Sequence, residues 1–402
     1  MKIVHVCRIF LENFIYQENE LVEMYGKLGH EVTVITSENV SSSFSIDAFW
    51  LKAPEVSPEK EKQVNYKIIR LPVKYKINFR FWRLKYLYET LSEIKPDLIF
   101  FHELTFFSLF DAVEYKRKNP SVKLVVDSHS DHYNSGRGFI SKAILHKCIY
   151  RNTIRKASKD IDFYYYLSPN IKNFMQEMYL IDNNNLKYLP RGGVIENLNI
   201  ENADAIRYMI REQLGIPQNA IVLINGGKLN YEKKTHNLLE AENCLNNPDV
   251  YLIVFGSIDS KYQKIIEPYV KKNSNIRMIG WIHSKDVHKY FLASDIACFP
   301  GSHSVLWEEA ICCGLPLIVK DWYNGMYYLN VKDNAILLKD SDTLCIEEAL
   351  RKLIDDPLLL NSMKINAQTF GREFFSYRRI AQSVIDDVGL SNMNEKQKTD
   401  LP

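Results

Sequence analysis

The sequence has no apolar run long enough to cross a membrane, and its 402 residues include only seven cysteines. A spanning helix needs about 18 or more apolar residues in succession, so the chain is not expected to span a bilayer. The apolar run at its start is shorter than that of a secretory signal peptide. The cysteines are odd in number, scattered and without zinc-site spacing, which predicts reduced core residues in a cytoplasmic protein.

Motifs of several common enzyme classes are absent as well. The sequence lacks GxGxxG and GxxxxGK[ST], which excludes the usual NAD-binding and P-loop sites, and it lacks the GxSxG of α/β-hydrolases. Charge of one sign does not dominate, since 51 Lys and Arg face 49 Asp and Glu for a net charge of +2. That balance argues against a dedicated nucleic-acid-binding protein, so no nucleic-acid partner is expected.

What the sequence does contain is a regular alternation of short β-rich runs with segments of helical periodicity, the pattern of parallel βαβ units. The alternation starts twice. Predicted strands lie at 3–6, 32–35, 98–101, 124–126 and 163–167, and then at 221–224, 252–255, 276–279, 296–299, 317–319 and 336–338. We predict an α/β protein with two Rossmann-like, doubly wound domains that face a cleft, where ligands bind beyond the carboxyl ends of the strands.

The interruption between the two series sets the expected domains. A stretch rich in Gly, Asn and Asp near 189–203 is the predicted hinge, which gives domains at 1–195 and 196–372. A helix at 373–388 follows the last strand and is expected to return to the first domain. The polar tail, 389–402, is expected to be disordered.

The first stretch with candidate chemistry is NGGKLNYEKK at 225–234, directly after a predicted strand. Glycines such as Gly227 let the backbone approach a ligand closely. Lys228 and Lys233 bracket a turn before a predicted helix, and two ammonium groups beside a helix N-terminus suit a diphosphate. Solvated loop lysines would explain the same pattern equally well.

The second stretch, FPGSHSVLWEEAICCGLP at 299–316, runs from a predicted strand into a helix. Small residues at the start of that helix leave backbone N–H groups for an anionic ligand, and a glutamate further along can reach a ribose diol. Adjacent helical side chains point about 100° apart, so only one of Glu308 and Glu309 can face the cleft. The other is expected to be a surface charge.

Taken in this order, the two stretches resemble the retaining GT-B glycosyltransferases of family 4, glycosyl transferases group 1. Lys228 and Lys233 stand where the family carries an arginine and a lysine. Glu309 and the residues after it match the second half of the family's two-glutamate motif. The segment from Tyr16 to Ile35 is similar to the start of one branch of the family, and the resemblance covers most of the chain.

The resemblance implies a nucleotide-sugar donor whose diphosphate meets the two lysines and whose ribose meets Glu309. The sequence departs from the family at Gly301, the position at which the family usually has its first glutamate. In the family that glutamate contacts the transferred sugar, and here His303 or the neighbouring backbone is the expected substitute. Backbone near Trp281 is expected to pair with the base. The expected donor-binding residues are Gly227, Lys228, Lys233, Trp281, Ile282, Ser302, His303, Ser304 and Glu309.

A third stretch, VVDSHSDHYNS at 125–135, carries Asp127, His129, Asp131 and His132. By themselves these side chains are compatible with a metal site, but the family needs no metal, so neither metal nor cofactor is expected. By resemblance His129 lies close to the transferred sugar and completes a catalytic set with Lys233 and Glu309. The alternative is an ordinary loop histidine, and Glu103 is a weaker candidate.

Basic and aromatic residues alternate over 62–88, and a predicted helix at 141–156 adds further basic side chains. Such surfaces bind anionic lipid headgroups. An amphipathic helix with its aromatic residues in the core and its bases in solvent explains the pattern equally well. The expected location is therefore the cytoplasm, with peripheral attachment to the inner face of the plasma membrane as one alternative.

The expected activity is retaining transfer of a hexose or related sugar from a nucleotide-diphosphate donor to a glycan or lipid-linked acceptor in surface-polysaccharide assembly. Two alternatives stay open. A nucleotide-sugar epimerase of the same architecture would need acid–base carboxylates, for which Glu103, Asp127 and Asp131 are available. The missing first glutamate also allows a catalytically silent subunit that only binds a sugar nucleotide.

Overall fold

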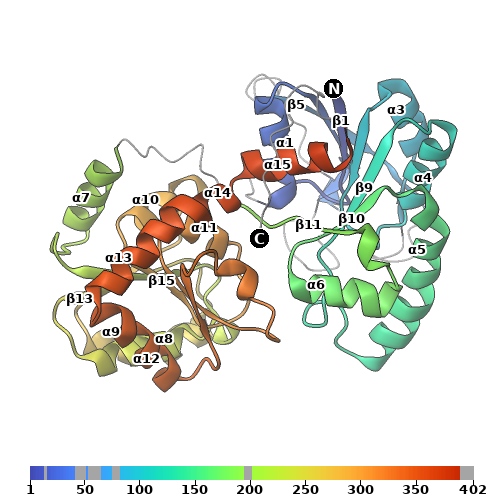
Figure 1. Cartoon of the computed structure of the whole chain (residues 1–402). Coiled ribbons are helices and arrows are strands. Elements are labelled where there is room, and N and C mark those ends of the chain that lie inside the picture. The colour runs from blue at the N-terminus through green and yellow to red at the C-terminus, as the bar shows by residue number, and fades with distance from the viewer. Residues whose placement is uncertain (13–15, 41–50, 53–64, 75–81, 194–201, 390–402) are drawn as a thin grey trace. The chain divides into compact units, whose positions relative to one another are not determined.

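The computed structural model describes residues 1–12, 16–40, 51–52, 65–74, 82–193 and 202–389. The chain divides into two compact units, which are described separately below (Figure 1). Unit 1 comprises residues 1–189 and 378–402, and unit 2 comprises residues 190–377. The predicted boundary at 195, and the predicted tail 389–402 apart from Gly389, lie outside the described residues.

Unit 1 is built on a seven-stranded sheet in which all neighbouring strands are parallel. Its spatial order is β11 (Leu186–Tyr188), β10 (Phe163–Tyr166), β9 (Lys123–Ser128), β8 (Leu98–Phe101), β1 (Lys2–Val6), β2 (Glu31–Ser37) and β5 (Tyr66–Leu71). From β1 the chain first builds the sheet outward through β2 and then returns to add β8 on the other side. The switch point of this sheet therefore lies between β1 and β8, where ligands bind in doubly wound sheets.

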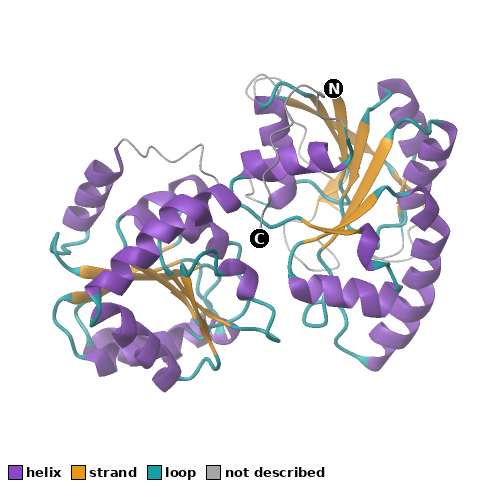
Figure 2. Ribbon diagram, in the orientation of Figure 1, coloured by secondary structure: helices purple, strands orange, loops and turns teal. Residues whose placement is uncertain are grey.

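Helices cover both faces of the sheet of unit 1 (Figure 2). They are α1 (Gln17–Lys27), α3 (Leu87–Ile94), α4 (Leu109–Lys118), a π-helix (Ser141–Tyr150), α5 (Arg151–Ala157), α6 (Pro169–Phe174), a second π-helix (Met175–Tyr179) and α15 (Tyr377–Asp387). Two further antiparallel strand pairs form separate two-stranded sheets, β3 (Asn39–Val40) with β4 (Leu51–Lys52) and β6 (Val73–Lys74) with β7 (Arg83–Leu84). Because both faces are covered, β8 and residues 3–6 of β1 are fully buried.

The last helix of the chain, α15, belongs to unit 1 from Arg378 onward. Two side chains of the sheet hold it, since Tyr165 donates a hydrogen bond to the Asp387 carboxylate at 2.9 Å and Lys187 pairs with the same group at 2.6 Å. The helix predicted at 373–388 corresponds to α15 but begins only at Tyr377, because residues 375–376 interrupt the helical backbone between α14 (Arg372–Phe374) and α15. The carbonyl of Phe375 accepts a hydrogen bond from the Gly193 N–H at 3.0 Å there, which takes it out of helical pairing.

Unit 2 has a six-stranded parallel sheet. Its spatial order is β14 (Ile276–Gly280), β13 (Val250–Phe255), β12 (Ile221–Gly226), β15 (Ile296–Phe299), β16 (Leu317–Lys320) and β17 (Ala335–Leu338). The order reverses between β12 and β15, which places the switch point at the carboxyl ends of these two strands. Both units are thus parallel-sheet α/β domains, and the predicted fold class is confirmed.

The helices of unit 2 lie on both sides of its sheet (Figure 2). They are α7 (Ala203–Gln213), α8 (Thr235–Leu245), α9 (Ser260–Lys272), α10 (Val287–Leu292), α11 (Leu306–Cys312), α12 (Thr343–Ile354), α13 (Pro357–Asn366), a π-helix (Ala367–Gly371) and α14 (Arg372–Phe374). Across the described residues of both units, no helix is long and apolar enough to cross a membrane.

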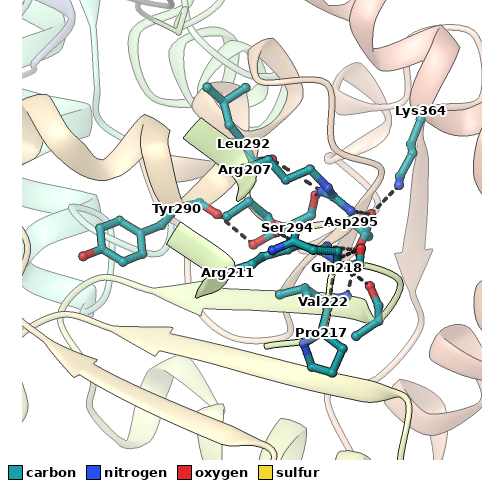
Figure 3. A network of polar contacts seen from close by, with 12 residues as sticks. Arg207, Arg211, Pro217, Gln218, Val222, Tyr290, Leu292, Ser294, Asp295 and Lys364 are labelled. Atoms are coloured by element: carbon teal, nitrogen blue, oxygen red, sulfur yellow. Dashed lines mark hydrogen bonds and ion pairs between the residues drawn. The ribbon is translucent and has the colours of Figure 1, made fainter. Parts of the chain in front are cut away.

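A buried carboxylate ties the first helix of unit 2 to its sheet (Figure 3). Asp295 pairs with Arg207 and Arg211 of α7 at 2.7 Å each and with Lys364 of α13 at 2.6 Å, and it accepts the Val222 N–H at 2.8 Å. Burial alone would raise the pKa of this carboxyl, but the three cations outweigh burial and lower it. The carboxylate is therefore charged and fully engaged.

Candidate active site

Two loops frame the switch point of unit 2, one after β12 and one after β15, and they are the first two stretches singled out in the sequence. They touch each other through the backbone, because the Ser302 N–H donates to the Glu232 carbonyl at 2.9 Å. The Lys233 ammonium donates to the carbonyl of Ser302 at 2.9 Å and to that of His303 at 2.5 Å. Lys233 therefore clasps the two loops together.

Gly301 is required by this contact. A Cβ atom placed on Gly301 would lie 2.1 Å from the carbonyl carbon of Lys233, far inside van der Waals contact with backbone that cannot swing aside. A glutamate could not occupy this position without moving the loop after β12. The backbone of Lys233 thus fills the space next to the position where the family pattern has its first glutamate.

Glycines also let the ends of β12 and β13 approach closely. Gly227 and Gly256 have φ angles of +113° and +122°, which side chains rarely tolerate. A Cβ on Gly256 would lie 1.8 Å from the Gly227 oxygen, whereas one on Gly227 would meet only the Leu306 methyl at 3.6 Å and the Ser304 hydroxyl at 4.0 Å. Gly227 and the start of α11 therefore face each other.

The two lysines differ in their surroundings. Lys228 is exposed, as expected of a solvated loop lysine, whereas Lys233 is half-buried and bonded. Burial lowers the pKa of the Lys233 ammonium to about 8. An ammonium has three N–H donors and two meet the loop carbonyls, so one remains for an anionic ligand.

Glu308 and Glu309 are both buried, at 1% and 9% exposure, so the prediction that one of them is a surface charge is wrong. The reason is that α11 is enclosed on every side, and all seven of its residues are buried. Burial raises the pKa of Glu308 to about 7, against the opposing influence of Arg191. The Tyr328 hydroxyl donates to Glu308 at 3.4 Å.

His303 lies in a chain of polar contacts that the sequence did not reveal. The Arg191 guanidinium lies 3.0 Å from Nδ1 of His303, and Nε2 of His303 lies 3.4 Å from the Tyr328 hydroxyl. Burial, Arg191 and Lys233 together lower the pKa of His303 well below its usual value. No motif marks Arg191 or Tyr328, since they come from distant parts of the sequence that only the fold joins.

Trp281 and Ile282 directly follow β14, two strands away from β12 in the sheet. Trp281 is exposed, and its ring contacts that of His283 with centroids 5.7 Å apart. The two residues therefore lie on the same edge of the sheet as the loops after β12 and β15. An exposed indole at this edge is available to a planar group.

The switch point of unit 1 holds a second polar cluster, centred on the fully buried Asp127 at the end of β9. Its carboxylate lies 2.7 Å from Nδ1 of His102, accepts the Glu103 N–H at 2.8 Å and lies 3.6 Å from Nε2 of His129. Glu103 in turn accepts the backbone N–H of His129 at 3.3 Å. His129 is thus held through both its ring and its backbone.

The electrostatics of this cluster favour a charged pair. Burial alone would raise the pKa of the Asp127 carboxyl, but His102 and His129 hold it well below its usual range. Burial likewise lowers the pKa of His129, yet Asp127 outweighs burial and the pKa ends above its usual value. His129 is therefore an ion-paired histidine and not a freely solvated one.

The other two members of the third stretch point elsewhere. Asp131 accepts the backbone N–H groups of Tyr133 at 2.8 Å and Asn134 at 2.7 Å, which closes a turn. His132 pairs with Glu177 at 3.0 Å. Among the residues that the structure describes, no three His, Cys, Asp or Glu side chains are grouped as metal ligands.

Comparison with known proteins covers both units. A family model described as Glycosyltransferase Family 4 matches residues 19–194, and one described as Glycosyl transferases group 1 matches residues 207–370. The uncharacterized glycosyltransferase MJ1069 of Methanocaldococcus jannaschii is 25% identical over 363 residues, which are 82% of this chain and 86% of that protein.

Solved structures show the same fold. Anabaena HepE in complex with UDP is similar with a TM-score of 0.69 and 16% identity, over 97% of this chain and 100% of that one. WaaG, a glycosyltransferase involved in lipopolysaccharide biosynthesis, is similar with a TM-score of 0.63 and 16% identity, over 96% and 99% of the two chains. With both units matched by glycosyltransferase models and a fold shared with these enzymes, the chain belongs to the GT-B glycosyltransferases of the group 1 and family 4 type.

Proposed function

We propose that the protein is a retaining glycosyltransferase that moves a hexose or related sugar from a nucleotide-diphosphate donor to a glycan or lipid-linked acceptor in surface-polysaccharide assembly. The observation that carries the donor assignment is the clasp formed by Lys233. It joins the two loops of the switch point and leaves one N–H of a poorly solvated ammonium for a diphosphate. The role in surface polysaccharides is supported by the likeness to WaaG.

In this proposal the bond between the sugar and the β-phosphate breaks, and negative charge develops on the leaving diphosphate. Lys233 stabilises that charge where it appears, with Lys228 as an exposed second cation. Glu309 binds the ribose, the backbone at Trp281 and Ile282 pairs with the base, and the 302–304 backbone faces the phosphates. His129 holds hydroxyl groups of the transferred sugar.

No covalent nucleophile, metal ion or cofactor is proposed. The acceptor hydroxyl oxygen bonds to the anomeric carbon from the face that the diphosphate leaves and passes its proton to the leaving phosphate oxygen, which keeps the anomeric configuration. The buried Asp127 is already engaged by three donors, which makes it a poor acid–base group for the epimerase alternative. HepE binds UDP, so a uridine nucleotide is the first donor to test here.

The donor assignment predicts that a nucleotide stabilises the protein against heat. With UDP or GDP at 100 times its dissociation constant, binding to the folded state alone adds about 2.7 kcal/mol. Glu309→Gln should lose most of this stabilisation because it weakens the hold on the ribose. The measurement is thermal unfolding with UDP, GDP, UDP-glucose and GDP-mannose, followed by the anomeric configuration of the transfer product.

Two results would contradict the assignment. Unfolding temperatures unchanged by all four nucleotides would remove the donor site from unit 2. Formation of an isomerised sugar nucleotide without any acceptor would show that the reaction is epimerisation and not transfer. Nucleotide binding without either reaction would show a catalytically silent subunit.

The structure refines the proposed membrane surface. In the first segment, 62–88, Arg70 pairs with Glu12 at 2.8 Å, Arg83 pairs with Asp111 at 2.7 Å and Trp82 is buried, while residues 62–64 and 75–81 lie outside the described part of the chain. These described side chains serve the fold and are not free for lipid. We therefore base the membrane proposal on the region around the π-helix at 141–150.

That region exposes apolar and basic side chains together. Phe139 and Ile140 are 82% and 72% exposed, and Ile144 on the next turn is also exposed. The basic residues nearby include Arg137 and Lys142. Aromatic and aliphatic side chains beside cations are the combination that enters an anionic bilayer surface.

The membrane proposal predicts that the protein co-sediments with phosphatidylglycerol vesicles and not with phosphatidylcholine vesicles. Binding should weaken as salt rises, because attraction acts within a Debye length of about 10 Å at 0.1 M. The double variant Phe139→Ser with Ile140→Ser should lose binding. Leu358→Ser, which removes an 84% exposed apolar side chain from unit 2, is the matched control and should bind normally. Equal binding by both variants would refute the surface.

A further inference from the structure

A line of three side chains runs from the core of unit 1 to His129. Nδ1 of His5 lies 2.8 Å from Nε2 of His102, and Nδ1 of His102 lies 2.7 Å from the Asp127 carboxylate. His5 lies in β1, His102 directly follows β8 and Asp127 lies in β9, and these three strands are neighbours in the sheet. His5 and Asp127 are fully buried, and His102 is nearly so. The parallel register of the three strands therefore sets the line.

The protons of this line can be placed from the contacts. Asp127 is ionised, so the ring nitrogen that faces it, Nδ1 of His102, must carry a hydrogen. In the Nδ1–H tautomer of His102, Nε2 is bare and accepts a hydrogen from Nδ1 of His5. The hydrogen bond from His5 to His102 and the one from His102 to Asp127 therefore both point toward the carboxylate.

His5 gives independent support for this placement. Its Nε2 is buried and has no hydrogen-bond partner, and its ring stacks on Phe100 with centroids 5.4 Å apart. A hydrogen on that nitrogen would be an unsatisfied buried donor, which folded proteins rarely contain. Burial also lowers the pKa of His5 well below its usual value, so the ring is neutral. The single hydrogen of His5 thus belongs on Nδ1.

We propose that His5 and His102 are positioning residues for His129, with the N–H bonds of all three rings directed toward the Asp127 carboxylate. His102 and the Glu103 N–H fix the two oxygens of Asp127, and the fixed carboxylate sets the orientation of the His129 ring. With Nε2 of His129 facing Asp127, Nδ1 is the nitrogen that remains for a substrate. This inference rests on the proposed sugar-binding role of His129.

The charges around His129 decide which hydrogen bonds it can make. Glu18 of α1, Glu103 after β8 and Asp127 of β9 all favour its charged form. An imidazolium is a donor at both nitrogens and accepts at neither. The positioned Nδ1–H therefore recognises an oxygen that accepts, such as a sugar hydroxyl oxygen.

Two variants of His102 separate positioning from folding. The side-chain amide of asparagine reaches about as far as Nδ1 of histidine, and that of glutamine about as far as Nε2. His102→Asn therefore keeps a donor to Asp127 and loses the contact with His5, whereas His102→Gln keeps the contact with His5 and loses the donor. A misplaced reacting group costs on the order of 10²-fold in rate.

The expected result is that His102→Gln lowers kcat with UDP-glucose or GDP-mannose on that order, while His102→Asn stays within roughly tenfold of the wild type. UDP affinity should be alike in the two variants, because the residues proposed to bind UDP lie in unit 2 and His102 lies in unit 1. Their Tm values should also be alike, which shows that both variants fold. Equal kcat values for the two variants, or a loss in His102→Asn that exceeds the loss in His102→Gln, would overturn the positioning role.

A measurement on the free protein tests the line without any substrate. Long-range ¹⁵N–¹H spectra of the ten histidines should show His5 and His102 as Nδ1–H tautomers. They should also show a His129 with a raised pKa, and that pKa should be lower in Asp127→Asn because the carboxylate that favours the charged ring is gone. An Nε2–H tautomer of His5, or an unchanged His129 titration in Asp127→Asn, would refute the line. A protein that passes this test but turns over neither donor would instead contradict the proposed function.

Discussion

Lys233→Ala is expected to lower the rate of sugar transfer by about 10²- to 10³-fold, the usual cost of removing one donor aimed at developing charge. The ammonium has one proposed and one observed role. In the proposal it offers an N–H to the diphosphate, and in the structure it ties the carbonyls of Ser302 and His303 to the loop after β12. Removing it therefore withdraws a cation and loosens the loop that would face the phosphates.

The matched control for this prediction is the next residue. Lys234 is also half-buried, but its ammonium packs over the Tyr231 ring at 4.3 Å and is not bonded to the loop after β15. Lys234→Ala should keep near-normal kcat. Steady-state kinetics of the two variants, with UDP titration beside them, give the comparison. Near-normal turnover by Lys233→Ala would remove this lysine from the donor site.

The same ammonium predicts a pH dependence of donor binding. Burial lowers its pKa to about 8, so the free protein loses this charge as the pH rises through that value. The charged form binds the diphosphate, and UDP affinity should therefore fall between roughly pH 7 and pH 9. Lys233→Ala should flatten this part of the profile. A wild-type affinity that stays constant over this range would show that the lysine does not contact the diphosphate.

Asp295→Ala is expected to lower the free energy of unfolding of unit 2 by about 3–5 kcal/mol, because it breaks a buried ion-pair network and strands its cations. Arg211 is fully buried, and its guanidinium would keep only backbone carbonyls as partners, those of Pro217, Gln218, Ala220 and Ala293. Helix α7 would lose its main attachment. The measurement is urea unfolding with probes in each unit.

Asp286→Ala is the control, since Asp286 forms a partly exposed pair with Lys289 at 2.7 Å. Surface pairs contribute about 0–1 kcal/mol, so this variant should stay close to the wild type. Because the folded pKa of Asp295 lies below its usual value, its contribution is present near neutral pH and declines as pH falls through the acid range. A loss for Asp295→Ala no larger than that for Asp286→Ala would refute the network's role.

Periodicity in the sequence was sufficient to predict most strands of both sheets, because buried parallel strands are short apolar runs with helices between them. Two strands of the seven-stranded sheet of unit 1 escaped prediction. β5 is an edge strand whose residues are mostly half-buried, so its pattern merges with the basic segment around it. β11 has only three residues, too few to show a period.

The sequence also determined where the chemistry lies. Gly227, Lys228 and the stretch from Gly301 stand directly after predicted strands, and parallel strands bring their carboxyl ends to one edge of a sheet. Local spacing therefore placed both loops at that edge, and the strand order of the structure makes them neighbours. Local spacing could not predict that Lys233 would clasp them, or that Gly301 would have the Lys233 backbone against it.

Tertiary structure alone decided the burial and pairing of the polar groups. Helix geometry alone predicts that the side chains of Glu308 and Glu309 point in different directions. Only the packing around α11 shows that both side chains are buried. The line from His5 through His102 to Asp127 joins residues from three strands that lie far apart in the sequence. Such contacts depend on strand order and register, which are set by the packing of the whole sheet and leave no local pattern in the chain.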